Sequence, residues 1–306
     1  MMPTVRHTPV LGETAVKLLV KRGAELLVDG TVGTGGHTEL ILERSEESTD
    51  VIGVDRDPGA IADARARLAP FGARVQLICA NFRELTRILG GRRADGFLLD
   101  LGISTYQLSD AKRGFSYLAN GPLDMAMGED GRSVEEFIAT ADEHSIARIL
   151  REYGEERRSR PIARQIVRTR VSRGMSSTLQ LREAVEMVAP REDVNGTLSR
   201  VFQALRIWAN GELESLSEFL PQAIELSNPG ARIVIISYHS LEDRIVKRFF
   251  RQEERGCTCP KDFPECRCGK SPRLKSITRS AVRPSPEEVE RNPRARSAKL
   301  RAAERL

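Results

Sequence analysis

The glycine-rich stretch after the first predicted strand constrains the fold of this chain more than any other feature. Residues 26–28 end an apolar strand, residues 29–36 contain four glycines in the order G-x-x-G-x-G-G, and residues 38–42 favour a helix. A strand, a glycine turn and a helix start together bring backbone N–H groups close to a ligand. The order differs from the G-x-G-x-x-G of dinucleotide sites, and no Lys-Ser or Lys-Thr pair follows as in a P-loop. A tight turn without a ligand is the alternative.

An acidic residue at the end of the second predicted strand sharpens this prediction. Val51 to Asp55 form an apolar run that ends in an acid, twenty residues after Gly35. In nucleoside-binding α/β folds, an acid at this place accepts hydrogen bonds from ribose hydroxyls. Asp55 could instead cap the next helix, but Asp57 followed by Pro58 is better placed for that role. The turn and the acid together favour a cofactor that contains adenosine.

The other predicted elements alternate in the way that builds a parallel sheet. Helices are expected over 13–21 and 58–68, and strands over 75–79, 97–100 and 232–237, the last after a turn at 227–230. This alternation is typical of an α/β fold, in which the site lies beyond the carboxyl ends of the strands. The residues expected at that edge are Gly35, Asp55, Asn81, Phe82 and Asp100.

A long insertion separates the fourth and fifth predicted strands. The 130 residues between Asp100 and Ala231 far exceed the dozen or more that one crossover needs. The insertion is predicted to be helical, with capping boxes at Ser133/Glu136 and Thr140/Glu143 and a helix end at Gly154. Its further helices are expected over 161–171, 179–188 and 198–208. The predicted domains are residues 1–104, an inserted helical substrate-recognition domain at 105–209, and residues 210–306 with a basic C-terminal tail.

Basic residues are unevenly distributed along the chain. Residues 270–306 hold eleven Lys or Arg and four Glu, which is +7, so a net charge of +5 leaves −2 for the rest. Residues 148–173 hold nine arginines and three glutamates. A basic tail and an arginine-rich helical face fit contact with phosphates and favour a nucleic-acid partner. Solvated charged surface is the alternative for both.

The cysteines and the apolar runs limit where the protein is expected to work. Five cysteines, with no apolar signal core in residues 1–9, predict reduced thiols or a metal in a cytoplasmic protein. The longest aliphatic run, 233–236, is far too short to span a membrane. A C-x-C-x6-C-x-C group could hold one structural zinc, although C-x2-C pairs are the usual spacing, and reduced thiols without metal are favoured. Its members are Cys257, Cys259, Cys266 and Cys268.

Longer motifs resemble a known family. From about His7 onward the chain is similar to the bacterial 16S rRNA cytosine-N4 methyltransferase family (RsmH, formerly MraW). The motifs are DGTVGTGGHT (29–38), DRDP (55–58), DLGIS (100–104), RGFSY (113–117), GPLDMAM (121–127), YGEERRSRPIARQI (153–166), RVFQALRIWAN (200–210), ISYHSLEDRIVKRFF (236–250) and NPRARSAKLR (292–301). The resemblance implies a class I, Rossmann-like methyltransferase with an inserted helical domain and S-adenosyl-L-methionine as cofactor. It implies methylation of the N4 amino group of a cytidine in the decoding region, with 16S rRNA or the small ribosomal subunit as partner.

The resemblance also assigns site residues position by position. For the cofactor it implies Gly35, Gly36, His37, Asp55, Phe82, Asp100 and Gln107. Of these, His37 and Gln107 depend mainly on the resemblance. The residues predicted to contact the substrate are Ser104, His239, Ser240, Arg244 and Lys247. Ser240 and Asp243 are also predicted to cap a helix that runs through Phe250, and ordinary surface charge is the alternative for this region.

Asp100 is the predicted catalytic residue. The N4 amino group of cytosine is a poor nucleophile, so acceptors such as the Asp100 carboxylate and the Leu101 carbonyl would orient it and stabilise the charge it gains. The (D/N/S)-P-P-(Y/F) motif of many amino-methylating enzymes is absent. Methylation at carbon 5 would need a cysteine nucleophile, and Cys79 is predicted to be core. The aromatic residue that stacks on the base stays open among Tyr106, Phe115 and Tyr238.

Three other functions fit part of the sequence. One is a methyltransferase that acts on a protein or on another nucleotide. A second is a ribosome-assembly factor that binds rRNA and keeps the cofactor site for stability alone. The third is an NAD oxidoreductase, which the missing third glycine disfavours. The oligomeric state, monomer or homodimer, and the choice between naked rRNA and an assembled subunit stay open.

Overall fold

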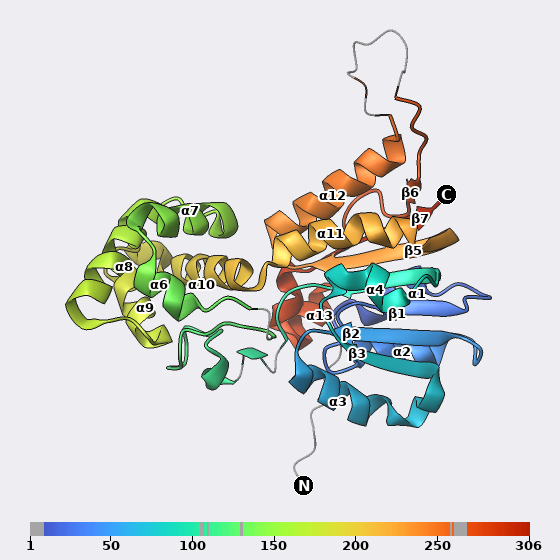
Figure 1. The fold of residues 1–306 in the computed structure, drawn as a ribbon, viewed down its shortest axis with the longest axis horizontal. Coiled ribbons are helices and arrows are strands. Elements are labelled where there is room, and N and C mark those ends of the chain that lie inside the picture. Colours follow the sequence, from blue (N-terminus) through green and yellow to red (C-terminus); the bar gives the residue numbers. More distant parts are fainter. Residues whose placement is uncertain (1–8, 105–106, 109, 129–130, 258, 260–267) are drawn as a thin grey trace. The chain divides into compact units, whose positions relative to one another are not determined.

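The chain divides into two units, shown in Figure 1 as a computed structural model. It describes residues 9–104, 107–108, 110–128, 131–257, 259 and 268–306. Residues 1–102 and 213–306 form the sheet unit, and residues 103–212 form the helical unit. Among the described residues, no helix has both the length and the apolar composition needed to cross a membrane.

A seven-stranded sheet in the order β3-β2-β1-β4-β5-β7-β6 is the centre of the sheet unit. Neighbouring strands are parallel, except that β7 runs antiparallel to both β5 and β6. The strands are β1 (Leu26–Asp29), β2 (Asp50–Asp55), β3 (Val75–Cys79), β4 (Ala94–Asp100), β5 (Ser227–Ser237), β6 (Leu274–Ser276) and β7 (Lys299–Arg305). Each predicted strand is present, and the predicted mostly parallel α/β fold is confirmed.

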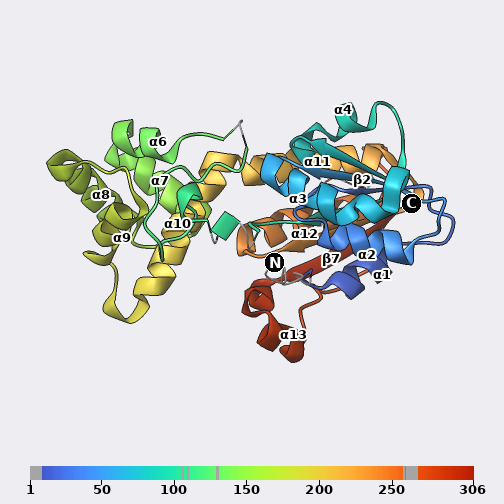
Figure 2. The same cartoon turned by 90° about the horizontal axis from the view of Figure 1, so that it is seen from below.

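Helices cover both faces of this sheet, as Figure 2 shows for α4 and α11 on one side and α1 and α2 on the other. Val28 and Phe97 pack toward α4, α11 and α12, whereas Leu27 and Leu98 pack toward α1, α2 and α3. Successive strand residues point to opposite faces, so the apolar runs are buried on both sides. The helices are α1 (Gly12–Leu19), α2 (Gly36–Arg44), α3 (Pro58–Leu68), α4 (Leu85–Leu89), α11 (Glu212–Glu225) and α12 (Ser240–Arg255).

Two details of the predicted strands are wrong. The turn predicted at 227–230 belongs to β5, because Ser227 already pairs with Ala94, and an irregularity in register follows this pair. Cys79, predicted to be core, is exposed. It ends β3, which is an edge strand of the sheet and has a neighbouring strand on one side only.

The basic C-terminal segment is part of the sheet and not a tail. It forms β6, the short helix α13 (Pro286–Arg291) and β7, which lies between β5 and β6. Some of its charge is paired: Arg273 bonds Glu253 at 2.6 Å, and Arg301 bonds Asp243 at 2.7 Å. The sheet includes this segment because β7 buries its apolar residues against β5.

Helices form the core of the second unit, as predicted for the insertion. They are α6 (Val134–Thr140), α7 (Glu143–Gly154), α8 (Ser159–Arg173), α9 (Thr178–Glu186) and α10 (Val194–Asn210). Ser133 caps α6 as expected. The predicted cap of α7 is wrong: the Asp142 carboxylate accepts from Ser145 N at 2.6 Å, while the Thr140 hydroxyl bonds a carbonyl inside α6. Gly154 is the last residue of α7 and Glu155 is its C-cap.

One buried side chain fastens an irregular segment to α10. Asn210 accepts a hydrogen bond from Met127 N at 2.8 Å and donates to Met125 O at 2.7 Å and to Arg206 O at 2.9 Å. Met125 and Met127 contribute to the core of the helical unit although they lie outside any helix or strand. The Asn210 amide thereby supplies the partners that these buried backbone groups need.

Replacing Asn210 with Ala should lower the free energy of unfolding by about 3 kcal/mol, because it leaves buried backbone groups without partners. Urea unfolding followed by circular dichroism measures the change. Asn195→Ala is the matched control, since Asn195 is exposed on the same helix and should change stability by less than about 0.5 kcal/mol. Equal losses in the two variants would contradict this role for Asn210.

Candidate active site

The glycine turn after β1 is tied to the ends of two neighbouring strands. Gly30 N donates to Leu98 O of β4 at 2.9 Å, and Val32 N donates to Val54 O of β2 at 2.8 Å. Gly33 and Gly35 have φ angles of 52° and 85°, which L-residues with a Cβ adopt only with strain. At Gly30 a Cβ would lie 2.5 Å from the Leu99 side chain. These constraints explain the glycines and hold the start of α2 at the strand ends.

Asp55 at the end of β2 is fixed by two backbone donors. Its Oδ2 accepts from Gly33 N and its Oδ1 accepts from Asp57 N, both at 2.9 Å. Burial raises the pKa of Asp55 to about 6, against the opposing effect of these hydrogen bonds. Asp57, as expected, is the N-cap of α3. Each Asp55 oxygen keeps a further lone pair, so the carboxylate can still accept hydrogen bonds from a ligand.

Asp100 at the end of β4 is held from two sides. Its backbone N donates to the Thr31 hydroxyl at 2.6 Å, and its Oδ1 accepts from the Tyr238 hydroxyl at 2.8 Å. Burial raises the pKa of Asp100 to about 7, although the Tyr238 hydrogen bond acts in the opposite direction. The structure thus gives Tyr238, a candidate for stacking, a different contact: its hydroxyl binds Asp100, and its ring lies against Gly102.

His37 lies in the same cluster and is 6% exposed. Its Nε2 is 3.0 Å from Val10 O, and its Nδ1 is 3.6 Å from Asp100 Oδ2. Because a carbonyl oxygen only accepts, we assign the ring proton to Nε2, which leaves the Nδ1 lone pair facing Asp100. Burial also lowers the pKa of His37, which favours the neutral form of the ring. A lone pair facing Asp100 disfavours a negative charge on that carboxyl.

Asp29 is a site residue that the sequence analysis did not single out. It is fully buried at the end of β1, where it accepts from Thr31 N at 3.2 Å and from the Thr38 hydroxyl at 2.7 Å. Burial raises its pKa to about 6, while the hydrogen bonds from Thr38 and Thr31 act against this rise. An acid directly before the glycine turn, nine residues before a threonine at the start of a helix, is the signal that could have predicted it.

Phe82 and Asn81 follow β3 at the same edge of the sheet. Asn81 is buried and caps the short turn of helix over 82–84 by accepting from Arg83 N at 3.2 Å. Phe82 packs edge-on against Phe219 of α11, with ring centroids 5.7 Å apart. Its Cβ also approaches the position that a Cβ on Gly30 would take, at 3.3 Å. Phe82 therefore lies beside the glycine turn.

His239, and not Ser240, is the N-cap of α12, so the predicted cap is wrong. The His239 ring accepts from Glu242 N at 3.4 Å, and the Glu242 carboxylate accepts from His239 N at 3.3 Å. This capping box places the third-position acid at Glu242 and leaves Asp243 to pair with Arg301. Ser240 begins α12, and Arg244 and Lys247 lie one and two turns further along it.

Gln107 and Ser104 belong to the helical unit and bind each other. Ser104 N donates to Gln107 Oε1, and Gln107 N donates to the Ser104 hydroxyl, both at 3.1 Å. Phe115 is buried in the core of the same unit, so it is not available to stack on a base. Tyr106, another candidate for stacking, and Cys266 of the cysteine group lie outside the described residues.

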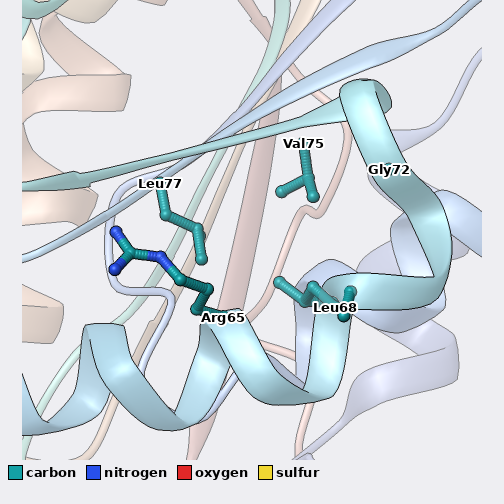
Figure 3. Close-up of a pocket in the computed structure, with 6 residues that line it drawn as sticks. Arg65, Leu68, Gly72, Val75 and Leu77 are labelled. Atoms are coloured by element: carbon teal, nitrogen blue, oxygen red, sulfur yellow. The ribbon is translucent and has the colours of Figure 1, made fainter.

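A cavity of about 150 Å³ lies away from the strand ends that carry these residues. Figure 3 shows Leu68 of α3 pointing toward Val75 and Leu77 of β3, with Arg65 at the side. Val75 is the first residue of β3, so the cavity adjoins the opposite end of that strand. None of the predicted site residues lines it.

The sheet order with reversed β7, the glycine turn after β1 and the acid that ends β2 define a class I S-adenosylmethionine-dependent methyltransferase fold. The chain belongs to the MraW methylase family, whose model matches residues 4–306. It is 48% identical over 308 residues to the ribosomal RNA small subunit methyltransferase H of Carboxydothermus hydrogenoformans, covering 98% of each chain. A protein of the same name from Geobacter sulfurreducens is 48% identical over 311 residues, 99% of this chain and 100% of the relative. A solved rRNA methylase from Streptococcus thermophilus aligns over 99% of both chains, with 10% identity and a TM-score of 0.44.

Replacing Asp100 with Asn should stabilise the protein at neutral and alkaline pH but not at about pH 4. Burial raises the pKa of Asp100 to about 7, so the folded protein holds this proton more tightly than the unfolded chain does. The destabilisation is absent below about pH 4, grows up to about pH 7 and then stays constant. Near pH 8.5 the variant should therefore be more stable by about 2–4 kcal/mol, with little difference near pH 4.

Urea unfolding at these two pH values measures the effect. Asp63→Asn is the control, because Asp63 is an exposed acid on α3. It should leave the difference in stability between the two pH values unchanged. A gain of the same size at both pH values for Asp100→Asn would show that ionisation of Asp100 is not the cause.

Proposed function

We propose that this protein transfers a methyl group from S-adenosylmethionine to the N4 amino group of a cytidine in the decoding region of 16S rRNA. The observation that carries the proposal is the Asp100 carboxylate at the end of β4, held by Tyr238 and Thr31 beside the glycine turn. The two relatives named ribosomal RNA small subunit methyltransferase H support small-subunit rRNA as the substrate. The assignment of a decoding-region cytidine as the target, and of its N4 atom as the methyl acceptor, depends on the family motifs.

The strand ends of the sheet unit fit the parts of the cofactor. The Asp55 carboxylate, with a free lone pair on each oxygen, would accept hydrogen bonds from the ribose hydroxyls. Gly35 and Gly36 at the start of α2 let the backbone approach the ligand closely, and Phe82 would lie against the adenine. When bound, the cofactor supplies an electrophilic methyl group on a sulfonium sulfur.

Asp100 would act on the amino group of the target base. Its Oδ1 is engaged by the Tyr238 hydroxyl, so Oδ2 is the atom that can accept a hydrogen from N4. As the N4–methyl bond forms, the nitrogen gains positive charge, which a carboxylate in a site of low polarity stabilises strongly. Because burial raises the pKa of Asp100 to about 7, the same oxygen can take the proton that N4 releases. Tyr238 is then a positioning residue that fixes the carboxylate.

Changing Asp100 to Ala should abolish methylation while the protein stays folded. Nucleosides from small-subunit rRNA of cells that lack the protein are compared by mass spectrometry with those of cells that carry the wild type, Asp100→Ala or the control Asp63→Ala. We expect one N4-methylated cytidine to be absent without the protein and to be restored by the wild type and Asp63→Ala only. Calorimetric titration with S-adenosylmethionine separates a loss of chemistry from a loss of cofactor binding.

An active Asp100→Ala protein would remove Asp100 from the mechanism. An unchanged nucleoside profile, together with normal cofactor binding, would indicate a different acceptor molecule. If the protein does not bind the cofactor and does not change the nucleoside profile, the results would favour a ribosome-assembly factor.

A basic groove of about 420 Å³ between α12 and β6 supports an RNA partner. Its one acid, Glu254, accepts hydrogen bonds from Ser276, and Arg301 pairs with Asp243. The cations that line the groove and form no ion pair with a described residue are Lys247, Arg251, Lys275 and Arg279. Four such cations in one concave surface are suited to successive phosphates. Lys247 was already predicted to contact the substrate.

Replacing Lys247 and Arg251 together with Ala should weaken binding to small-subunit rRNA. Loss of two phosphate contacts should lower the affinity roughly tenfold at about 0.15 M salt and reduce the slope of log K against log salt by about 2. Filter binding over a salt series measures both quantities. Lys17→Ala with Arg22→Ala is the matched control, because both side chains are exposed near α1 outside the groove. An equal loss in the control pair would mean that charge alone, and not the groove, determines binding.

The helical unit is proposed to recognise the rRNA around the target base. Exposed arginines on α7, α8 and the segment between them support this, since several form no ion pair with a described residue. They are Arg151, Arg157, Arg160 and Arg168. The domain boundaries, the cytoplasmic location and the roles of His37, Gln107, Ser104, His239, Ser240 and Arg244 stay predictions of the same proposal.

A further inference from the structure

We propose that Cys257, Cys259 and Cys268 bind a zinc ion. The three Sγ atoms converge, each within 4.8 Å of the other two, although Cys259 and Cys268 are nine positions apart in the chain. The proposal does not depend on the methyltransferase activity. It also does not depend on Cys266, which lies outside the described residues.

The spacing of the sulfur atoms fits a metal and is longer than a disulfide bond. Cys257 Sγ and Cys268 Sγ are 3.8 Å apart. Zinc binds thiolate sulfur at about 2.3 Å, so two sulfurs of a tetrahedral site lie about 3.8 Å apart. A disulfide would need about 2.05 Å. Soft thiolate ligands select zinc over magnesium or calcium. The set therefore supplies three of the four positions of a tetrahedral zinc site.

Contacts between the end of α12 and residues 271–273 hold the two sides of the cysteine group together, and these contacts do not require a metal. Arg273 N donates to Glu253 O at 2.9 Å, and the Arg273 guanidinium bonds the Glu253 carboxylate at 2.6 Å. Gly256 packs against the backbone, since a Cβ there would lie 2.4 Å from the carbonyl carbon of Ser271. Cys257 follows directly after this contact, two residues beyond the end of α12. The sheet unit should thus fold without zinc, and the ion would link Cys257 and Cys259, just after α12, to Cys268.

The first test is the metal content of the full chain purified without chelators. Elemental analysis should find about one zinc per chain in the wild type and in Cys79→Ser, whose thiol is exposed outside the cluster. Cys257→Ser with Cys268→Ser should retain about a tenth of this or less. Wild type that holds no stoichiometric zinc after incubation with Zn²⁺ and gel filtration would overturn the proposal. So would a double variant that keeps its zinc.

The second test uses the thiols themselves and does not require activity. Alkylation followed by peptide mass spectrometry should show Cys79 modified quickly in both metal states. Cys257, Cys259 and Cys268 should be protected with zinc and exposed after chelation. Replacement by Co²⁺ should give a thiolate-to-metal charge-transfer band that the double variant lacks. Circular dichroism and calorimetric binding of S-adenosylmethionine verify that the variant is folded. Equal alkylation of all four cysteines in the zinc-loaded protein would contradict the proposal.

Discussion

The hydrogen bonds of the turn after β1 are the constraint on which the rest of the sheet unit depends. Within four residues, this turn bonds the end of β4 through Gly30, the end of β2 through Val32, and Asp55 through Gly33. The Thr31 hydroxyl adds a bond to the backbone of Asp100. Residues that lie far apart in the sequence are thereby held within one polar cluster. A substitution that shifted the turn would displace the carboxylates of two other strands together.

Burying the carboxylates of this cluster costs free energy, and the same burial raises their pKa values. Three carboxyl groups, those of Asp29, Asp55 and Asp100, have pKa values raised by burial into the range of about 6 to 7. Each has donors nearby that offset only part of the cost of removing a charge from water. Of the three, Asp29 is completely buried and serves the turn, whereas Asp100 keeps one oxygen for another partner. Similar side chains thus have different tasks because their partners differ.

Most of the secondary structure could be predicted because it depends on local patterns. The apolar runs and the helical spacing located each described strand of the parallel sheet and the helices of the insertion. The predictions that are wrong depend on competition between neighbours or on distant contacts. Two polar residues that lie close together in the sequence can both cap a helix, and the sequence pattern alone does not distinguish Ser240 from His239 or Thr140 from Asp142. The basic segment gave no sign that β7 would enter the sheet between β5 and β6.

The difference between local patterns and distant contacts also decides which parts of the candidate site could be predicted. Gly35, Asp55 and Asp100 follow from their places after predicted strands, whereas the contact between Tyr238 and Asp100 joins residues 138 positions apart and leaves no local signal. His37 and Gln107 depended on motifs of a known family. The family and the fold predicted from those motifs are confirmed, and the roles of the individual residues stay predictions.

The insertion affects the order in which the parts of the protein can fold during synthesis. β4 pairs with β5, yet the helical unit lies between them in the chain. At translation rates of about 5–20 residues per second, β4 waits roughly ten seconds for its neighbour. During that time the helical unit, whose contacts are closer in sequence, can complete its own core. The edge of β4 stays open to wrong partners meanwhile. Asp100 acquires its hydroxyl partner only after Tyr238 has been synthesised, so the candidate active site is among the last parts of the protein to be assembled.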